Sequence, residues 1–205
     1  SLNPLVTPRK TDFFILDIDS TLVTTHQRNQ TILQDWIKNH RQQFPEDCNV
    51  LLKAERQFGD YGLRSVKERL QFKETNPGSQ DSLDAFWKKH FFSNDYLSSD
   101  VAMRGAVNWV QNLEEKGVGF VYLTARHKTA MWDGTLSSMD ELGFPISKDN
   151  LFLKEDLSES DDTYKTNLVK QISLQQKDKV IWIIDNEPVV LNRIKKDHPE
   201  IKLAF

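Results

Sequence analysis

The sequence predicts an α/β fold in which helices cover a parallel sheet and an all-helical unit is inserted into the chain. Three observations support this class. Residues 13–16 form an unbroken apolar run, which is typical of a strand covered on both faces. From Val101 onward, short apolar runs alternate with longer segments of helical periodicity, the pattern of a parallel sheet. Between residues 26 and 97, apolar residues recur at helical spacing and no segment resembles a strand.

The first predicted strand ends in two carboxylates, Asp17 and Asp19. Because side chains alternate along an extended chain, both are expected to point to the same side. Ligands of such sheets bind at the carboxyl ends of the strands. Two like charges there call for a compensating cation, most simply Mg2+, which prefers oxygen ligands. For this segment alone, two solvated aspartates at a strand terminus are the alternative interpretation.

The remaining core elements are expected in a regular order along the chain. Apolar runs bounded by turn signals predict the strands, and residues at helical spacing predict the helices. The expected strands are residues 120–123 (ending at 124–126), 151–153, 180–184 and a last edge strand at 201–204; the expected helices begin near 105, follow residue 126, and span 164–174 and 189–196.

The inserted segment contains a series of helical patterns. Apolar residues from 32 to 44 recur at helical spacing until Pro45 interrupts them, and the pattern continues from Val50 to Phe58. A second pair of helices is expected at 63–70 and 83–91, separated by a turn. Its leucines and aromatic residues are explained as packing.

Composition indicates the broad class of the protein. The chain has 205 residues, of which 38% are hydrophobic and 28% charged, and its net charge is -3, as expected for a soluble globular protein. No basic excess supports a nucleic-acid partner. No apolar run is long enough to cross a bilayer and the first residues lack a signal peptide, so the cytoplasm is the default expectation. The single Cys48 is expected to be a packing residue.

Three predicted strands end in polar residues that suit one reaction. Asp17 and Asp19 end the first, Thr124 the second and Asp185 the third, and Lys165 opens the helix before the last of them. Together, a cation site, a hydroxyl donor, an ammonium and a nucleophilic carboxylate fit a phosphoryl group.

Each of these residues alone has a simpler interpretation. Thr124 could cap the following helix, and Lys165 could be a solvated lysine. Asp185 could be a turn residue at a strand end. Lys154, directly after the strand at 151–153, competes with Lys165, which is preferred because it precedes the strand of Asp185.

Four short motifs resemble those of the haloacid dehalogenase (HAD) superfamily of phosphohydrolases. Residues 17–21 (DIDST) resemble its first motif and residues 121–126 (VYLTAR) its second. Lys165 resembles the third and residues 183–187 (IIDNE) the fourth. Their order and strand context run through most of the chain, and they are specific to the superfamily rather than to a substrate.

The resemblance implies a Rossmann-like three-layer core with a small helical cap inserted after the first motif. The core would comprise residues 11–25 and 98–205, and the cap residues 26–97. Such a cap closes over the active site and selects the leaving group. Four cap cations are candidates for contact with an anionic substrate, although a solvated helix face is the better explanation for most of them: Arg56, Arg64, Lys67 and Arg69.

The resemblance also implies a role for each motif residue. Asp17 would be the nucleophile that forms an aspartyl-phosphate, and Asp19 the general acid and base. Mg2+ would be held by the Asp17 carboxylate, the Asp19 backbone carbonyl and the Asp185 carboxylate. Thr124 would donate a hydrogen bond to a phosphoryl oxygen, and Lys165 would offset negative charge.

The chain departs from the family pattern at two positions. Ser20 replaces the commoner glycine of the first motif, and Asn186 stands where many relatives have a second aspartate. One negative charge on the metal side is therefore missing; Asn186 could orient a metal-bound water, and Glu187 could restore the charge. Arg126 and His127 could reach a substrate or lie on the surface. The candidate substrate-contacting or supporting residues are Ser20, Thr21, Ala125, Arg126, Asn186 and Glu187.

The sequence therefore predicts a Mg2+-dependent phosphatase acting on a small phosphorylated metabolite, a phosphomonoester, through an aspartyl-phosphate. A phosphotransferase or mutase of the same superfamily is the nearest alternative. A phospho-accepting receiver domain and a non-catalytic binding protein on this scaffold are further alternatives. In receivers, however, the acceptor lies on a central strand and the acidic pair at the end of the first strand, whereas here the expected acceptor belongs to the pair itself. Receivers also have no long helical insertion. The substrate and the oligomeric state do not follow from the sequence.

Overall fold

The computed structural model describes residues 7–54, 62–156 and 158–204, and the chain divides into two compact units. Ser1–Thr24 and Ala102–Phe205 form the first, here called the core unit. Thr25–Val101 forms the second, the helical unit, and the expected insertion at residues 26–97 falls within it.

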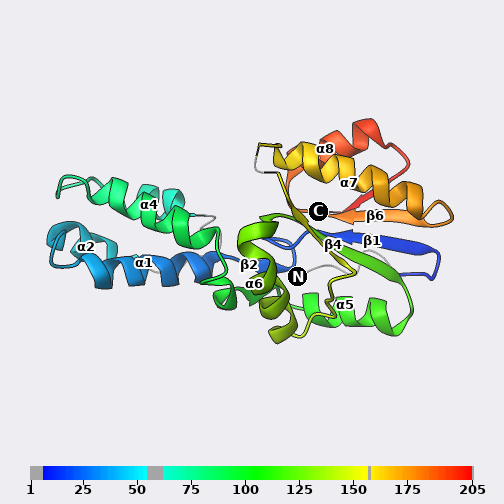
Figure 1. Cartoon of the computed structure of the whole chain (residues 1–205), viewed down its shortest axis with the longest axis horizontal. Helices are drawn as coiled ribbons and strands as arrows, with labels where there is room; N and C mark the ends of the chain where they lie inside the picture. Colours follow the sequence, from blue (N-terminus) through cyan, green and yellow to red (C-terminus); the bar gives the residue numbers. More distant parts are fainter. Residues whose placement is uncertain (1–6, 55–61, 157, 205) are drawn as a thin grey trace. The chain divides into compact units, whose positions relative to one another are not determined.

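The core unit contains a five-stranded sheet whose paired strands are all parallel (Figure 1). The strand order is β5-β4-β1-β6-β7, so the first strand of the chain lies at the centre. This arrangement confirms the predicted α/β class, and the last strand confirms the expected edge strand. The strands are β1 (Asp12–Leu16), β4 (Gly119–His127), β5 (Leu151–Lys154), β6 (Val180–Ile184) and β7 (Lys202–Ala204).

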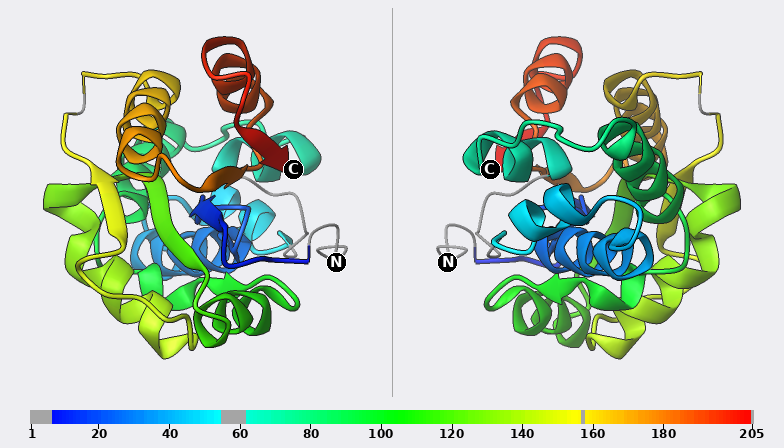
Figure 2. Two further views of the ribbon diagram at one scale, coloured as in Figure 1. Left: turned by 90° about the vertical axis from the view of Figure 1, so that its right-hand side faces the viewer. Right: turned by 90° about the vertical axis from the view of Figure 1, so that its left-hand side faces the viewer.

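Helices cover both faces of this sheet and give the core unit three layers. In Figures 1 and 2, α7 and α8 lie over one face, and α5 and α6 lie over the other. Apolar side chains from α7 and α8 pack with those of one sheet face, among them Val169 and Ile194 against Ile15 and Ile183. The helices are α5 (Ala106–Glu115), α6 (Lys128–Glu141), α7 (Asp161–Gln175) and α8 (Pro188–Asp197).

The central strand β1 is buried on both faces, which explains its unbroken apolar sequence. Phe13 and Ile15 join the core under α7 and α8. Phe14 points to the other face, where its ring lies 5.3 Å from that of Trp109 on α5. Full burial of each such side chain contributes about 1.5–3 kcal/mol, so apolar packing fixes the place of β1 firmly. Asp17, the residue after Leu16, is thereby held at the carboxyl edge of the sheet.

Strand β4 is longer than the sequence suggested, because it continues through the polar residues 124–127. Thr124 pairs with Leu153 of β5, and the next pairing is His127 with Lys154, so two residues of β4 bulge out between them. A bulge of this kind lets a strand continue while changing the direction of its side chains. The expected end of the strand is therefore a bulge, and the residues displaced by it are Ala125 and Arg126.

The helical unit has its own apolar core, which includes Trp36, Leu83 and the free Cys48, a packing residue as expected. The second helix begins at Pro45 and ends at Leu51, so Ala54 of the predicted pattern is not helical, and Phe58 lies outside the described residues. Its end tightens into i→i−3 hydrogen bonds at the residues that follow. The elements are α1 (His26–His40), α2 (Pro45–Leu51), α3 (Leu63–Arg69), α4 (Ser79–Phe91) and the 3-10 helix η1 (Leu97–Ser99).

Two short strands, β2 (Val23–Thr24) and β3 (Val101–Ala102), pair as a separate two-stranded sheet. They were not predicted, because two residues are too few to show an alternating pattern.

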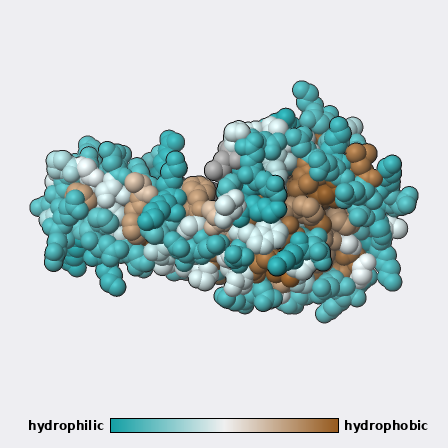
Figure 3. All heavy atoms as spheres, in the orientation of Figure 1, coloured by the Kyte–Doolittle hydropathy of each residue, from teal (hydrophilic) through white to brown (hydrophobic). Residues whose placement is uncertain are grey.

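Hydrophilic side chains predominate on the face shown in Figure 3. Among the described residues, no helix combines the length and apolar character required to cross a bilayer.

Candidate active site

The sheet order brings the three predicted strand ends together. Leu16 of β1 pairs with Tyr122 of β4 on one side and with Ile184 of β6 on the other. Asp17 and Asp185 each follow directly after these paired residues, and Thr124 comes two residues after Tyr122. All three polar side chains are buried at the carboxyl edge: Asp17 is 4% exposed, and Thr124 and Asp185 are each 1% exposed.

Lys165, in the first turns of α7, joins the two carboxylates. Its Nζ donates to Asp17 Oδ1 at 2.9 Å and to Asp185 Oδ2 at 2.8 Å, and it lies 3.8 Å from Glu187 Oε2. Lys154, the competing lysine, instead pairs with Asp161 at the start of α7. The structure therefore places Lys165, and not Lys154, between the acidic strand ends.

Burial and charge shift the ionisation of this cluster in the metal-free chain. Burial raises the pKa of Asp17 to about 7; Lys165 opposes this rise, and the charge of Asp185 adds to it. Burial alone would lower the pKa of Lys165, but the charges of Asp17 and Asp185 raise it, so the ammonium stays protonated. Burial also raises the pKa of Glu187. The cluster thus holds its lysine charged while its acids compete for one cation.

The turn after β1 orients Asp17. The Thr21 hydroxyl donates to Asp17 Oδ2 at 2.9 Å and accepts the Asn186 backbone N–H at 3.1 Å. Asn186 Oδ1 lies 3.3 Å from the same hydroxyl oxygen. Ser20 adopts φ 62°, in the left-handed region that glycine enters without strain, which explains why a small residue suits this position. Thr21 therefore fixes one oxygen of the candidate nucleophile, and Asn186 holds Thr21 in turn.

Asp19 forms a bidentate ion pair with Arg126. Arg126 Nε donates to Asp19 Oδ2 and Nη2 donates to Asp19 Oδ1, both at 2.8 Å. The Arg126 side chain is 2% exposed, so the surface alternative for this residue is wrong. A third donor, Nη1, bonds Thr135 Oγ1 on α6 at 3.2 Å. Thr135 carried no signal in the sequence, since it is one of many polar residues in a predicted helix.

Thr124 does not cap the helix that follows it. The N-cap position of α6 is His127, and the Thr124 hydroxyl accepts the Arg126 backbone N–H at 3.2 Å within the bulge. Among the described residues, no acceptor is found for the Thr124 hydroxyl hydrogen. Ala125 is the other bulged residue, and His127 Nε2 lies 3.1 Å from the Glu155 carbonyl oxygen.

The donor set fits a hard divalent cation. Asp17 and Asp185 offer buried carboxylate oxygens, which are ligands that Mg2+ prefers. All four carboxylate oxygens already accept one hydrogen bond, from Lys165, Thr21 or the Glu187 N–H, but each can accept a second interaction. No three side chains of Asp, Glu, His or Cys form a ready-made cluster in the described part of the chain. A cation here would depend on backbone and water oxygens.

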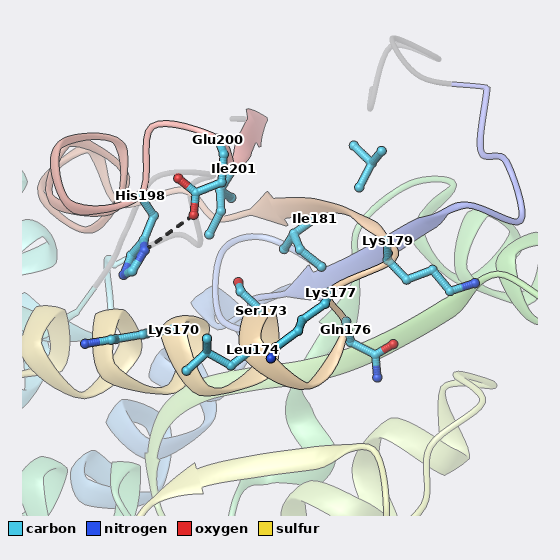
Figure 4. Close-up of a pocket in the computed structure, with 11 residues that line it drawn as sticks. Lys170, Ser173, Leu174, Gln176, Lys177, Lys179, Ile181, His198, Glu200 and Ile201 are labelled. Atoms are coloured by element: carbon cyan, nitrogen blue, oxygen red, sulfur yellow. Dashed lines mark ion pairs between the residues drawn. The ribbon is translucent and has the colours of Figure 1, made fainter.

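A separate cavity of about 470 Å³ opens at the opposite edge of the sheet (Figure 4). It is lined by the second half of α7, the start of β6 and the turn before β7, including Lys170, Leu174 and Ile181. His198 and Glu200 face each other across part of it at 3.6 Å. None of the candidate site residues lines this cavity.

The sequence matches no protein-family model and no curated protein. Solved structures do match over nearly the whole chain. A hydrolase from Streptococcus pneumoniae TIGR4 aligns with a TM-score of 0.58 at 9% identity, covering 96% of this chain and 92% of that one. A HAD-superfamily hydrolase of subfamily IA from Geobacter sulfurreducens aligns with a TM-score of 0.55 at 14% identity, covering 95% and 86%.

A protein from Clostridium difficile assigned as a phosphatase aligns with a TM-score of 0.57 at 14% identity, covering 96% of this chain and 85% of its own. The chain has the HAD-hydrolase fold. The resemblance that the four motifs indicated is thereby confirmed at the level of the fold. At such low identity, the likeness shows the fold and does not assign the chemistry of the candidate site.

Proposed function

We propose that the chain is a HAD-type phosphatase that hydrolyses a small phosphomonoester through an aspartyl-phosphate and depends on Mg2+. The observation that carries the proposal is the buried arrangement of Asp17, Lys165 and Asp185 at the carboxyl edge of a HAD fold. A structural ion pair needs only one carboxylate for each lysine. Two buried carboxylates around one lysine leave a surplus negative charge, which suits a site that receives a cation.

In the first half-reaction, a carboxylate oxygen of Asp17 attacks phosphorus and the bond from phosphorus to the substrate oxygen breaks. Asp19 supplies the proton that the departing alcohol takes up. The second oxygen of Asp17 is held by Thr21 at 2.9 Å, which orients the nucleophile before the substrate arrives.

In the second half-reaction, a water oxygen attacks the phosphorus of the aspartyl-phosphate and its proton passes to Asp19. The bond between phosphorus and Asp17 breaks, which releases inorganic phosphate and restores the carboxylate. Thr124 donates its hydroxyl hydrogen to a phosphoryl oxygen, and Lys165 offsets the negative charge at Asp17. Mg2+, held by Asp17, the Asp19 carbonyl and Asp185, would neutralise phosphoryl charge and help to align the substrate.

Phosphate release from a panel of phosphomonoesters tests the proposal. Wild-type protein should release phosphate in the presence of Mg2+, and the release should stop when a chelator removes the metal. Asp17→Asn should lower the rate at least about 10³-fold, as loss of a covalent nucleophile does. The matched control is Asp178→Asn, an exposed aspartate before β6, which should keep full activity.

The products separate hydrolysis from phosphoryl transfer. Free phosphate as the product supports a phosphatase, whereas a phosphorylated alcohol would identify a phosphotransferase. Phosphate release that persists in Asp17→Asn, or that is unchanged when the chelator is added, would contradict the proposed mechanism.

A further inference from the structure

We infer that Arg126 is a positioning residue for Asp19 and that it acts mainly on hydrolysis of the aspartyl-phosphate, an inference that rests on the proposed function. The supporting contact is the two-point pair in which Arg126 Nε and Nη2 each lie 2.8 Å from a different Asp19 oxygen. Arg126 ends the segment that resembles the second motif, but the resemblance gives this arginine no role toward Asp19.

The two partners differ in exposure, which shows which one positions the other. The Asp19 side chain is 33% exposed, whereas that of Arg126 is 2% exposed. Arg126 is also anchored by Thr135, through Nη1 at 3.2 Å, and its backbone N–H is bound by Thr124. A planar guanidinium held at several points fixes both the place and the plane of the carboxylate that it binds. The buried arginine is therefore the fixed partner.

The β4 bulge explains how an arginine reaches this position. Between Thr124 and His127 the strand gains two residues over its neighbour β5, and Arg126 is one of them. Bulges often direct a side chain into an adjacent active site. Here the bulge begins directly after Thr124, the residue that we place at the phosphoryl group. The same bulge therefore sets the positions of both Thr124 and Arg126.

The geometry of the pair indicates which half-reaction it supports. Arg126 holds the Asp19 carboxylate at two points, so it fixes the place of the oxygen that takes up a proton from water when the aspartyl-phosphate is hydrolysed. With an activated aryl ester, the leaving group departs with little help from an acid. Loss of Arg126 should then slow the second half-reaction far more than the first.

Rapid mixing with p-nitrophenyl phosphate and Mg2+ measures the two steps separately. The burst of p-nitrophenol reports formation of the aspartyl-phosphate, and subsequent release of inorganic phosphate reports its hydrolysis. For Arg126→Met we expect hydrolysis to slow by about 10–100-fold with little change in the burst rate, and phosphorylated protein to accumulate in intact-mass spectra. Arg126→Lys keeps the positive charge but cannot make the paired hydrogen bonds of the guanidinium, so hydrolysis should be slowed less than in Arg126→Met.

A double-mutant cycle tests whether Arg126 acts through Asp19. If it does, adding Arg126→Met to Asp19→Asn should slow hydrolysis no further than Asp19→Asn alone. Arg193→Met is the matched control, because Arg193 also pairs with an aspartate of the core unit, Asp162 at 2.6 Å, and should leave both steps unchanged.

Several outcomes would overturn the inference. They are equal slowing of both steps in Arg126→Met, additive losses in the double variant, or full activity in Arg126→Met. Thr135→Val removes only the hydrogen bond that anchors the Arg126 side chain and should slow hydrolysis by about threefold to tenfold. This milder variant tests the inference if Arg126→Met does not fold. If the wild type releases no p-nitrophenol at all in the presence of Mg2+, that result would instead count against the proposed function.

Discussion

Lys165 is the residue on which the charge balance of the candidate site depends. Its ammonium lies within 2.9 Å of Asp17 Oδ1 and 2.8 Å of Asp185 Oδ2, and all three side chains are almost fully buried. Without the ammonium, the two carboxylates would repel each other in a place where water cannot screen them.

Replacing Lys165 by methionine should separate metal binding from catalysis. We expect turnover to fall by about 10²–10³-fold, because the positive charge beside the phosphoryl group is lost. Mg2+ affinity should rise, because the cation no longer competes with the ammonium for the two carboxylates. Titration calorimetry and phosphate release measure the two effects.

The control for this substitution is Lys154→Met, which removes a lysine that pairs with Asp161 outside the cluster. It should leave Mg2+ affinity unchanged. Weaker Mg2+ binding in Lys165→Met would show that the lysine is needed to assemble the metal site and would contradict the expected competition.

At the scale of elements, strands β1 and β4 approach closely where Gly119 faces Phe13. A Cβ added to Gly119 would lie 2.6 Å from Phe13 Cδ2, closer than packed carbon atoms allow, and Phe13 belongs to the buried core. Gly119→Ala should therefore destabilise the protein by about 1–3 kcal/mol, although alanine normally favours a strand more than glycine does.

Urea unfolding of this variant measures the effect, and Gly62→Ala is the comparison. A Cβ at Gly62 would meet Trp87 at 3.6 Å, an ordinary contact, so little change is expected there. Equal stability of Gly119→Ala and wild type would mean that Phe13 moves aside without cost.

In the helical unit, Asp47 ties the start of α2 to the turn before α4. Its carboxylate accepts the backbone N–H groups of Thr75 and Asn76, each at 2.9 Å, and the Ser79 hydroxyl. Burial alone would raise the pKa of Asp47, but these hydrogen bonds outweigh it and hold the pKa below its ordinary value of 3.8. The ionised carboxylate is therefore the form that stabilises this unit.

The sign of the resulting pH dependence follows from that direction. A lowered pKa in the folded state gives stability that is complete above the unfolded value of 3.8 and is lost as pH falls below it. Asp47→Ala should cost about 1–3 kcal/mol near neutral pH, and the difference from wild type should shrink as the pH is lowered below 3.8. Urea unfolding at several pH values measures it.

Asp81→Ala, at an exposed position in the first turn of α4, is the control and should change stability by no more than about 0.5 kcal/mol. A constant difference between Asp47→Ala and wild type across the acid range would show that packing, rather than the ionised carboxylate, is responsible.

At the scale of the whole molecule, the sequence predicted what depends on order along the chain. The alternation of apolar runs and helices gave the parallel sheet, and a polar residue after each run located Asp17, Thr124 and Asp185. Contacts that depend on strand register were not predictable. The Asp19 pair with Arg126 requires the β4 bulge, which exists only in the pairing with β5 and leaves no periodic pattern in the sequence. Thr135 was missed because nothing distinguishes it from the other polar residues of its helix.

The two units make separate contributions to the thermal stability of the protein, and Mg2+ binding should distinguish them. A ligand that binds only the folded state stabilises it by about 2.7 kcal/mol at a concentration one hundred times its dissociation constant. Mg2+ should therefore raise the unfolding temperature of the wild type, and Asp17→Asn should lose most of this shift because a candidate ligand is gone.

Asp47, by contrast, belongs to the helical unit and contacts residues of that unit alone in the bonds described. Asp47→Ala should unfold at a lower temperature yet keep the full Mg2+ shift, as measured by thermal scans with Mg2+ and with chelator. An unchanged shift in Asp17→Asn would place the cation elsewhere in the protein.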